Sequence, residues 1–139
     1  MLLSCNYGGK PQSINQHELD LKDGAVISFL LVGHAYGGQK PKNSDVAYSL
    51  LENINLLNSL KPDYMMLLGD IIQETSPSDI QSLRSFTAQL EFPVFNAPGN
   101  HELLNPEKYK AEFGPSFFHF MHDSSLFVVN SQQYRHRKA

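Results

Sequence analysis

Three apolar runs of strand length constrain the fold of this chain more than any other feature. They cover residues 25–32, 64–68 and 92–96. Short runs of this kind are typical of strands that are buried on both faces of a sheet. Each run leads into a turn that contains glycine, and a polar side chain follows it, as in Gly33-His34, Gly69-Asp70 and Gly99-Asn100. The pattern therefore predicts a sheet in which each strand is followed by a polar side chain that could bind a metal ion or transfer a proton.

The segments between these runs predict helices. Residues 44–60 carry apolar side chains near helical spacing, with Ser44 as a candidate N-cap and Pro62 just beyond the end. Residues 77–90 begin with a proline at the first helical position, and Ser76 before it is a suitable cap. Strand and helix thus alternate through the first two thirds of the chain.

The last third predicts one more helix and a hairpin. The helix covers residues 106–113, and the hairpin strands cover 117–120 and 126–130 around a turn at Asp123-Ser124. The order is βαβαβ, then a short helix, then the hairpin. Alternation of this kind predicts an α/β fold with a parallel sheet, in which ligands bind beyond the carboxyl ends of the strands.

One domain accounts for most of the chain. Residues 1–23 are polar and without periodicity, so we expect a leader or linker there, followed by the domain over 24–131 and a tail over 132–139. The net charge of −3 gives no reason to expect nucleic-acid binding. No apolar run approaches the roughly 18 residues of a transmembrane helix.

Cys5 is the single cysteine of the chain, which excludes an intrachain disulfide. The sequence leaves two interpretations of it open. Residues 2–5 resemble the end of a bacterial lipoprotein signal, which would make the protein an extracytoplasmic lipoprotein if the true start lies upstream. Otherwise Cys5 is an ordinary thiol and the protein is cytoplasmic.

Polar groups at the strand ends are the candidate site. Asp70 directly follows an apolar run, and a carboxylate there is costly to bury unless it is paired or binds metal. Asn100 and His101 are both metal-ligand types, and histidine also transfers protons near neutral pH. The alternatives are that Asp70 caps a loop, that Asn100 only holds a turn, and that His34 is an ordinary loop histidine.

Taken together, residues 61–70, 94–102 and 109–120 resemble the calcineurin-like metallophosphoesterases. The first stretch is similar to that family's strand ending in Gly-Asp, and the second to its Gly-Asn-His-Asp/Glu element. The resemblance implies the N-terminal half of the family's layered α/β sandwich. It also implies hydrolysis of phosphomonoesters or phosphodiesters with two divalent metal ions, such as Mn, Fe or Zn.

The resemblance assigns roles to individual residues. Asp70 would bridge the metals, Asn100 and His34 would each bind a metal, and His101 would be catalytic, stabilising charge or protonating the leaving oxygen. Four residues would support them: Gly69, Gly99, Glu102 and Tyr36.

Two departures from the family pattern open a second functional hypothesis. The family's first element is Asp-x-His, and here valine stands in the aspartate position of Val32-Gly33-His34. No residue matches the family's later histidine ligands, so we expect the chain to be a truncated domain with little activity alone. The alternative function is a catalytically inactive binding or structural protein with the same fold.

Overall fold

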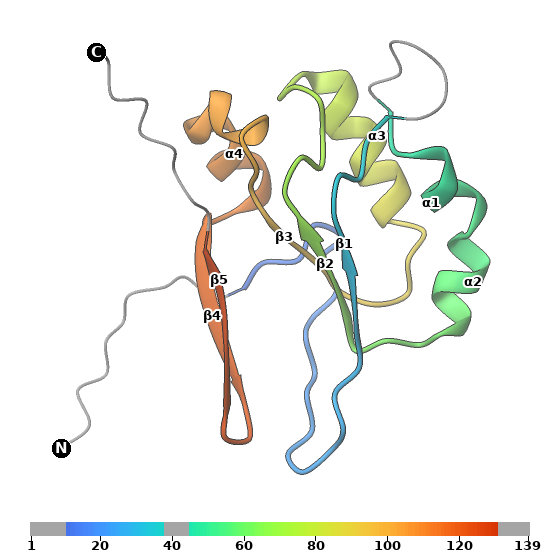
Figure 1. Ribbon diagram of the computed structural model, residues 1–139, viewed down its shortest axis with the longest axis vertical. Coiled ribbons are helices and arrows are strands. Elements are labelled where there is room, and N and C mark those ends of the chain that lie inside the picture. The colour runs from blue at the N-terminus through green and yellow to red at the C-terminus, as the bar shows by residue number, and fades with distance from the viewer. Residues whose placement is uncertain (1–10, 38–44, 131–139) are drawn as a thin grey trace, which may run out of the picture.

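A three-stranded parallel sheet forms the centre of the computed structural model, which describes residues 11–37 and 45–130. Its strands are β1 (Phe29–Val32), β2 (Tyr64–Leu68) and β3 (Val94–Ala97), in the order β1-β2-β3. The predicted α/β class with a parallel sheet is therefore confirmed (Figure 1). No helix in the described part of the chain is long and apolar enough to cross a membrane.

Helices connect the strands as predicted, but the first connection is not one helix. It contains α1 (Tyr48–Glu52) and α2 (Ile54–Ser59), which are separated at Asn53. The Asn53 side-chain amide donates to the Ser49 carbonyl oxygen at 2.7 Å, the acceptor that the Asn53 backbone N–H would use in a continuous helix. The expected helix over 44–60 is thus wrong in extent, and its candidate cap Ser44 lies outside the described residues.

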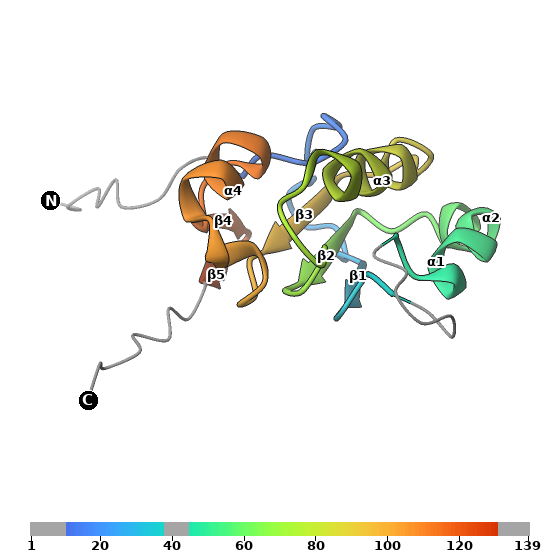
Figure 2. The same ribbon diagram turned by 90° about the horizontal axis from the view of Figure 1, so that it is seen from above.

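The second connection agrees with its prediction. Helix α3 (Pro77–Thr87) begins with proline, and the Ser76 hydroxyl accepts the backbone N–H of Asp79 at 3.1 Å. Each new strand is added on the same side of the preceding one, in the order β1-β2-β3. Right-handed crossovers therefore place the connecting helices on the same face of the sheet. Figure 2 shows α3 along one face of the sheet.

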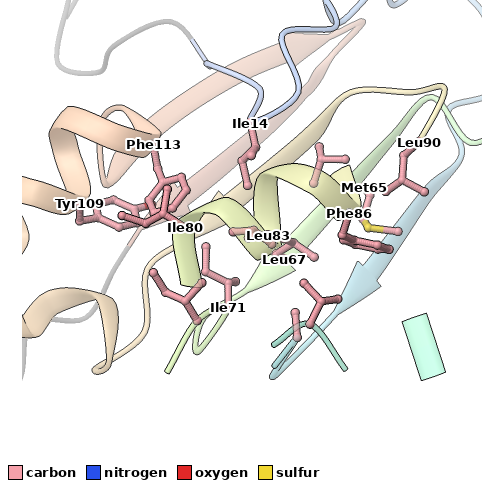
Figure 3. Packing of buried hydrophobic residues seen from close by; sticks show 14 of the residues in the cluster. Ile14, Met65, Leu67, Ile71, Ile80, Leu83, Phe86, Leu90, Tyr109 and Phe113 are labelled. Carbon is pink, nitrogen blue, oxygen red and sulfur yellow. The ribbon is translucent and has the colours of Figure 1, made fainter. Parts of the chain in front are cut away.

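That face carries the main core. Side chains of β2, β3 and α3 pack there with residues from the flanking loops, and α1 and α2 add partly buried side chains at the β1 side. Figure 3 shows ten labelled members of this cluster: Ile14, Met65, Leu67, Ile71, Ile80, Leu83, Phe86, Leu90, Tyr109 and Phe113.

The opposite face is covered only in part, by the hairpin of β4 (Phe117–His122) and β5 (Ser125–Asn130). The hairpin and its turn at residues 123–124 are confirmed. The expectation that the run 25–32 is a strand buried on both faces is wrong. Only Phe29–Val32 is strand, and Phe29 and Leu31 are 41% and 59% exposed because the hairpin covers this face of the sheet only in part.

The chain before β1 also contacts the sheet, which the sequence did not predict. The Ile14 backbone N–H donates to the Val94 carbonyl at 2.8 Å, and the Asn15 side-chain oxygen accepts the Val94 N–H at 3.2 Å. Residues 14–15 therefore pair with the outer edge of β3.

Candidate metal centre

The loops after the three strands meet at one edge of the sheet, as the topology predicts. The His34 N–H donates to the Gly69 carbonyl at 3.3 Å, and the Ala35 N–H donates to the Asp70 carbonyl at 3.1 Å. These bonds extend the pairing of β1 and β2 beyond the strand ends. They place the His34 Nδ1 atom 3.8 Å from the Asp70 Oδ2 atom.

Both residues of this pair have an unusual backbone. The φ angles of His34 and Asp70 are 55° and 49°, in the left-handed region. Aspartate and histidine enter this region more readily than most residues, but each still costs about 1 kcal/mol or more. Strained residues of this kind cluster at functional sites, where the surrounding structure holds them in place. Two of them facing each other therefore make this sheet edge a candidate site.

Glu102, in the short helix η1 (Glu102–Leu104), joins the loops after β2 and β3. Its side chain is fully buried, and its carboxylate accepts four backbone N–H groups. The Oε1 atom accepts from Ile71 at 2.8 Å and from Ile72 at 3.1 Å. The Oε2 atom accepts from Gly99 at 2.7 Å and from Asp70 at 3.1 Å. One carboxylate thus satisfies the backbone N–H donors of both turns and fixes the distance between the turns.

Glycine is required where these two turns touch. A Cβ atom on Gly99 would lie 2.3 Å from the Asp70 Oδ1 atom and 2.5 Å from the Asp70 nitrogen. A Cβ on Gly69 would lie 3.0 Å from the Gly99 Cα, and Gly69 has a φ of 75°. The close contact explains why the sequence has glycine at both positions.

The Asp70 carboxylate is the least satisfied group of the site. Its Oδ1 atom is buried and has no hydrogen-bond partner among the described residues. A buried carboxylate oxygen without a donor is costly, and a cation is one of the few partners that offset the cost. This observation fits a metal ion held by Asp70 with His34 beside it.

His101 lies at the same edge and is held at both ring nitrogens. Its Nδ1 atom is 2.8 Å from the Gln73 carbonyl oxygen, and its Nε2 atom is 3.2 Å from the Tyr36 hydroxyl. Partial burial, followed by the negative charges of Asp70 and Glu102, raises the pKa of the Tyr36 hydroxyl. The hydroxyl therefore keeps its proton near neutral pH.

Asn100 lies between Gly99, which touches Asp70, and His101. It is exposed, and its side-chain oxygen is a neutral ligand type suited to a hard cation. The structure thus brings Asp70 and His34 together directly, links His101 to His34 through the Tyr36 ring, and places Asn100 next to His101 in the chain.

Val32 is the last residue of β1 and is partly buried. Its side chain packs against the main core, whereas the residues that contact Asp70 and His101 are His34 and Tyr36. A carboxylate at position 32 would therefore enter the core side of the sheet. The pair of side chains that the first loop directs to the site is at positions 34 and 36.

The donor set fits a metal ion in part. Asp70 and His34 offer an oxygen and a nitrogen to one cation, and Asn100 adds a neutral oxygen nearby. Within residues 11–37 and 45–130, no group of three or more His, Cys, Asp or Glu side chains is placed to hold a metal ion. These residues are thus a partial coordination set with open positions.

Two contacts of the candidate site could not be found from the sequence. The Gln73 carbonyl that binds His101 is a backbone group, and no side-chain pattern reveals it. Tyr36 was predicted only as a supporting residue, and its bond to His101 depends on how two loops 65 residues apart meet.

A family model described as calcineurin-like phosphoesterase matches residues 17–136. No curated protein and no solved structure matches this chain significantly. The match covers all three strand-end loops and the hairpin.

Proposed function

The chain belongs to the calcineurin-like phosphoesterase family, and on that premise we propose that its strand-end loops bind divalent metal and take part in hydrolysis of a phosphate ester. The buried, unpartnered Oδ1 atom of Asp70 beside His34 is the observation that supports this most. The proposed substrates are phosphomonoesters or phosphodiesters.

Asp70 and His34 would hold the metal ion in this proposal, and Asn100 would add a neutral oxygen ligand. Divalent metal in such a site activates water and neutralises phosphoryl charge. The Glu102 carboxylate holds the turn at Asp70, because it accepts the Asp70 backbone N–H and three more N–H groups from the same turn and the facing one. The Asp70 backbone is therefore held before a cation binds, so little of the binding free energy is lost in ordering this turn.

His101 would handle the proton of the leaving group. The Gln73 carbonyl can only accept a hydrogen bond, so the Nδ1 atom of His101 carries a hydrogen. The Nε2 atom is then the position where a proton is taken up or given to a leaving oxygen.

A non-catalytic binding or structural role is the second candidate function. The partial donor set among the described residues favours it. In that case the protein would bind metal or phosphate ester without turnover.

The test is hydrolysis of p-nitrophenyl phosphate and bis(p-nitrophenyl) phosphate by the full chain with Mn²⁺, Zn²⁺ or Fe²⁺. We expect at most weak metal-dependent turnover from these 139 residues alone, in keeping with the partial donor set of the described residues, and its loss in both Asp70→Ala and His101→Ala. The matched controls are Asp20→Ala and His17→Ala, which change exposed residues far from the site in the sequence. Full activity in both site variants would contradict the proposal, and metal binding without turnover in the unchanged chain would favour the non-catalytic function.

A further inference from the structure

The Tyr36 hydroxyl contacts the one ring nitrogen of His101 that the backbone leaves open. We propose that Tyr36 is a positioning residue for His101, holding the neutral imidazole in the Nδ1–H tautomer with its Nε2 atom toward the metal-binding side. The proposal concerns how His101 is oriented, and its role in turnover rests on the proposed function.

The backbone around Tyr36 is well fixed. Tyr36 pairs with Val46 in an isolated antiparallel bridge, and the Gly37 N–H donates to the Asp45 carbonyl at 2.9 Å. The Ala47 N–H donates to the Ala35 carbonyl at 2.9 Å. Ala35 and Val46 are buried in the main core, at 0% and 3% exposure. The tyrosine ring therefore extends toward the site from an anchored pair of strand-like segments.

The other nitrogen of His101 is fixed from the loop after β2. The Gln73 carbonyl that accepts from Nδ1 follows directly after Ile71 and Ile72, whose N–H groups bind Glu102. With Nδ1 protonated, the Nε2 atom of a neutral ring is an acceptor, and the Tyr36 hydroxyl donates to it at 3.2 Å. The two bonds approach the ring from opposite sides and select one tautomer and one orientation.

The tyrosine ring also separates the two functional histidines. Its centroid lies 4.5 Å from that of His34 and 5.5 Å from that of His101. Tyr36 thus sets the distance between the residue next to Asp70 and the proton-handling residue. Without the hydroxyl, the imidazole is held at one nitrogen and can turn about that bond.

The direct test is long-range ¹H–¹⁵N NMR of histidine-labelled protein at alkaline pH, where the imidazole is neutral. Tyr36→Phe keeps the ring and removes only the hydroxyl. We expect His101 in the unchanged chain to show a protonated Nδ1 and an unprotonated Nε2. In Tyr36→Phe the Nε2 resonance should shift and the second tautomer should appear. Tyr48→Phe, at an exposed tyrosine of α1, is the matched control and should leave both resonances unchanged.

Two results would overturn the proposal. One is a His101 that already has the Nε2–H tautomer in the unchanged chain, and the other is a Tyr36→Phe variant with unchanged His101 resonances. If the unchanged chain turns over substrate, Tyr36→Phe should also lower kcat roughly tenfold with KM and metal affinity unchanged. An absence of turnover would count against the proposed function alone, because the NMR result decides the role of Tyr36 separately.

Discussion

The loops after β2 and β3 differ from the loop after β1 in how they are held. Four hydrogen bonds to one buried carboxylate and a glycine-to-glycine contact lock the first two together. The loop after β1 is joined to Gly69 and Asp70 by backbone bonds of 3.3 and 3.1 Å, and its His34 side chain is 62% exposed. The difference indicates a rigid part that orients Asp70 and a more open part that supplies His34.

This contrast separates the residues that stabilise the two turns from the residues proposed to bind metal. Residues such as Glu102 and Gly99 hold the rigid part and should affect folding strongly when changed. Residues of the β1 loop should affect metal binding or His101 orientation with a smaller effect on folding. Variants in the two regions can therefore test whether the loops differ in their effects on stability and on metal binding.

The largest effect is expected from Glu102→Ala. It leaves four backbone N–H groups without their acceptor, so we expect the free energy of unfolding to fall by about 3–5 kcal/mol. Urea denaturation measures the change. Glu91→Ala, at an exposed glutamate, is the control and should change stability by less than about 0.5 kcal/mol. A Glu102→Ala variant as stable as this control would show that the carboxylate does not hold the two turns.

Gly99→Ala should have the next largest effect. The new methyl group would overlap Asp70 backbone and side-chain atoms, so we expect a loss of about 2–3 kcal/mol together with weaker metal binding. The matched control is Gly33→Ala in the loop after β1, where a Cβ meets nothing within 4 Å. Thermal unfolding compares the two variants, and equal losses of stability would contradict the difference between the loops.

Val32→Asp should have a smaller effect, and it tests the direction of that side chain. We expect it to destabilise the fold by about 1–2 kcal/mol, because it brings a carboxylate against the main core. Metal affinity, measured by calorimetric titration, should stay unchanged. A marked rise in metal affinity would mean that position 32 reaches the site after all.

The sequence predicted which loops meet at this edge of the sheet better than it predicted the hydrogen bonds that hold them. Asp70, His34 and His101 lie at one edge of the sheet because the carboxyl ends of parallel strands meet there, whereas their roles stay predictions. The role of Glu102 was not predictable in detail, since four backbone donors converge on it only after two turns have formed. The exposure of Leu31 was missed because the sequence does not reveal how much of the second face of the sheet the hairpin covers.

Local chemistry explains the remaining differences. Ser76 was predicted as a cap from adjacent residues and is one, because capping depends on a few neighbouring positions. The break at Asn53 was missed because an asparagine inside an apolar helical pattern gives only a weak signal. Its side chain competes for the Ser49 carbonyl only in the folded chain.

Calorimetric titration of Mn²⁺ into the unchanged chain and into Asp70→Asn measures metal binding at this strand edge with and without the Asp70 carboxylate. We expect the unchanged chain to bind Mn²⁺ and Asp70→Asn to lower the affinity at least as much as the loss of about 10–100-fold that follows from changing a residue that only supports a ligand. The unfolding free energy should be maintained, because Asp70 Oδ1 has no hydrogen-bond partner among the described residues to lose. Equal Mn²⁺ affinity in the two proteins would contradict the assignment of this strand edge as a metal centre.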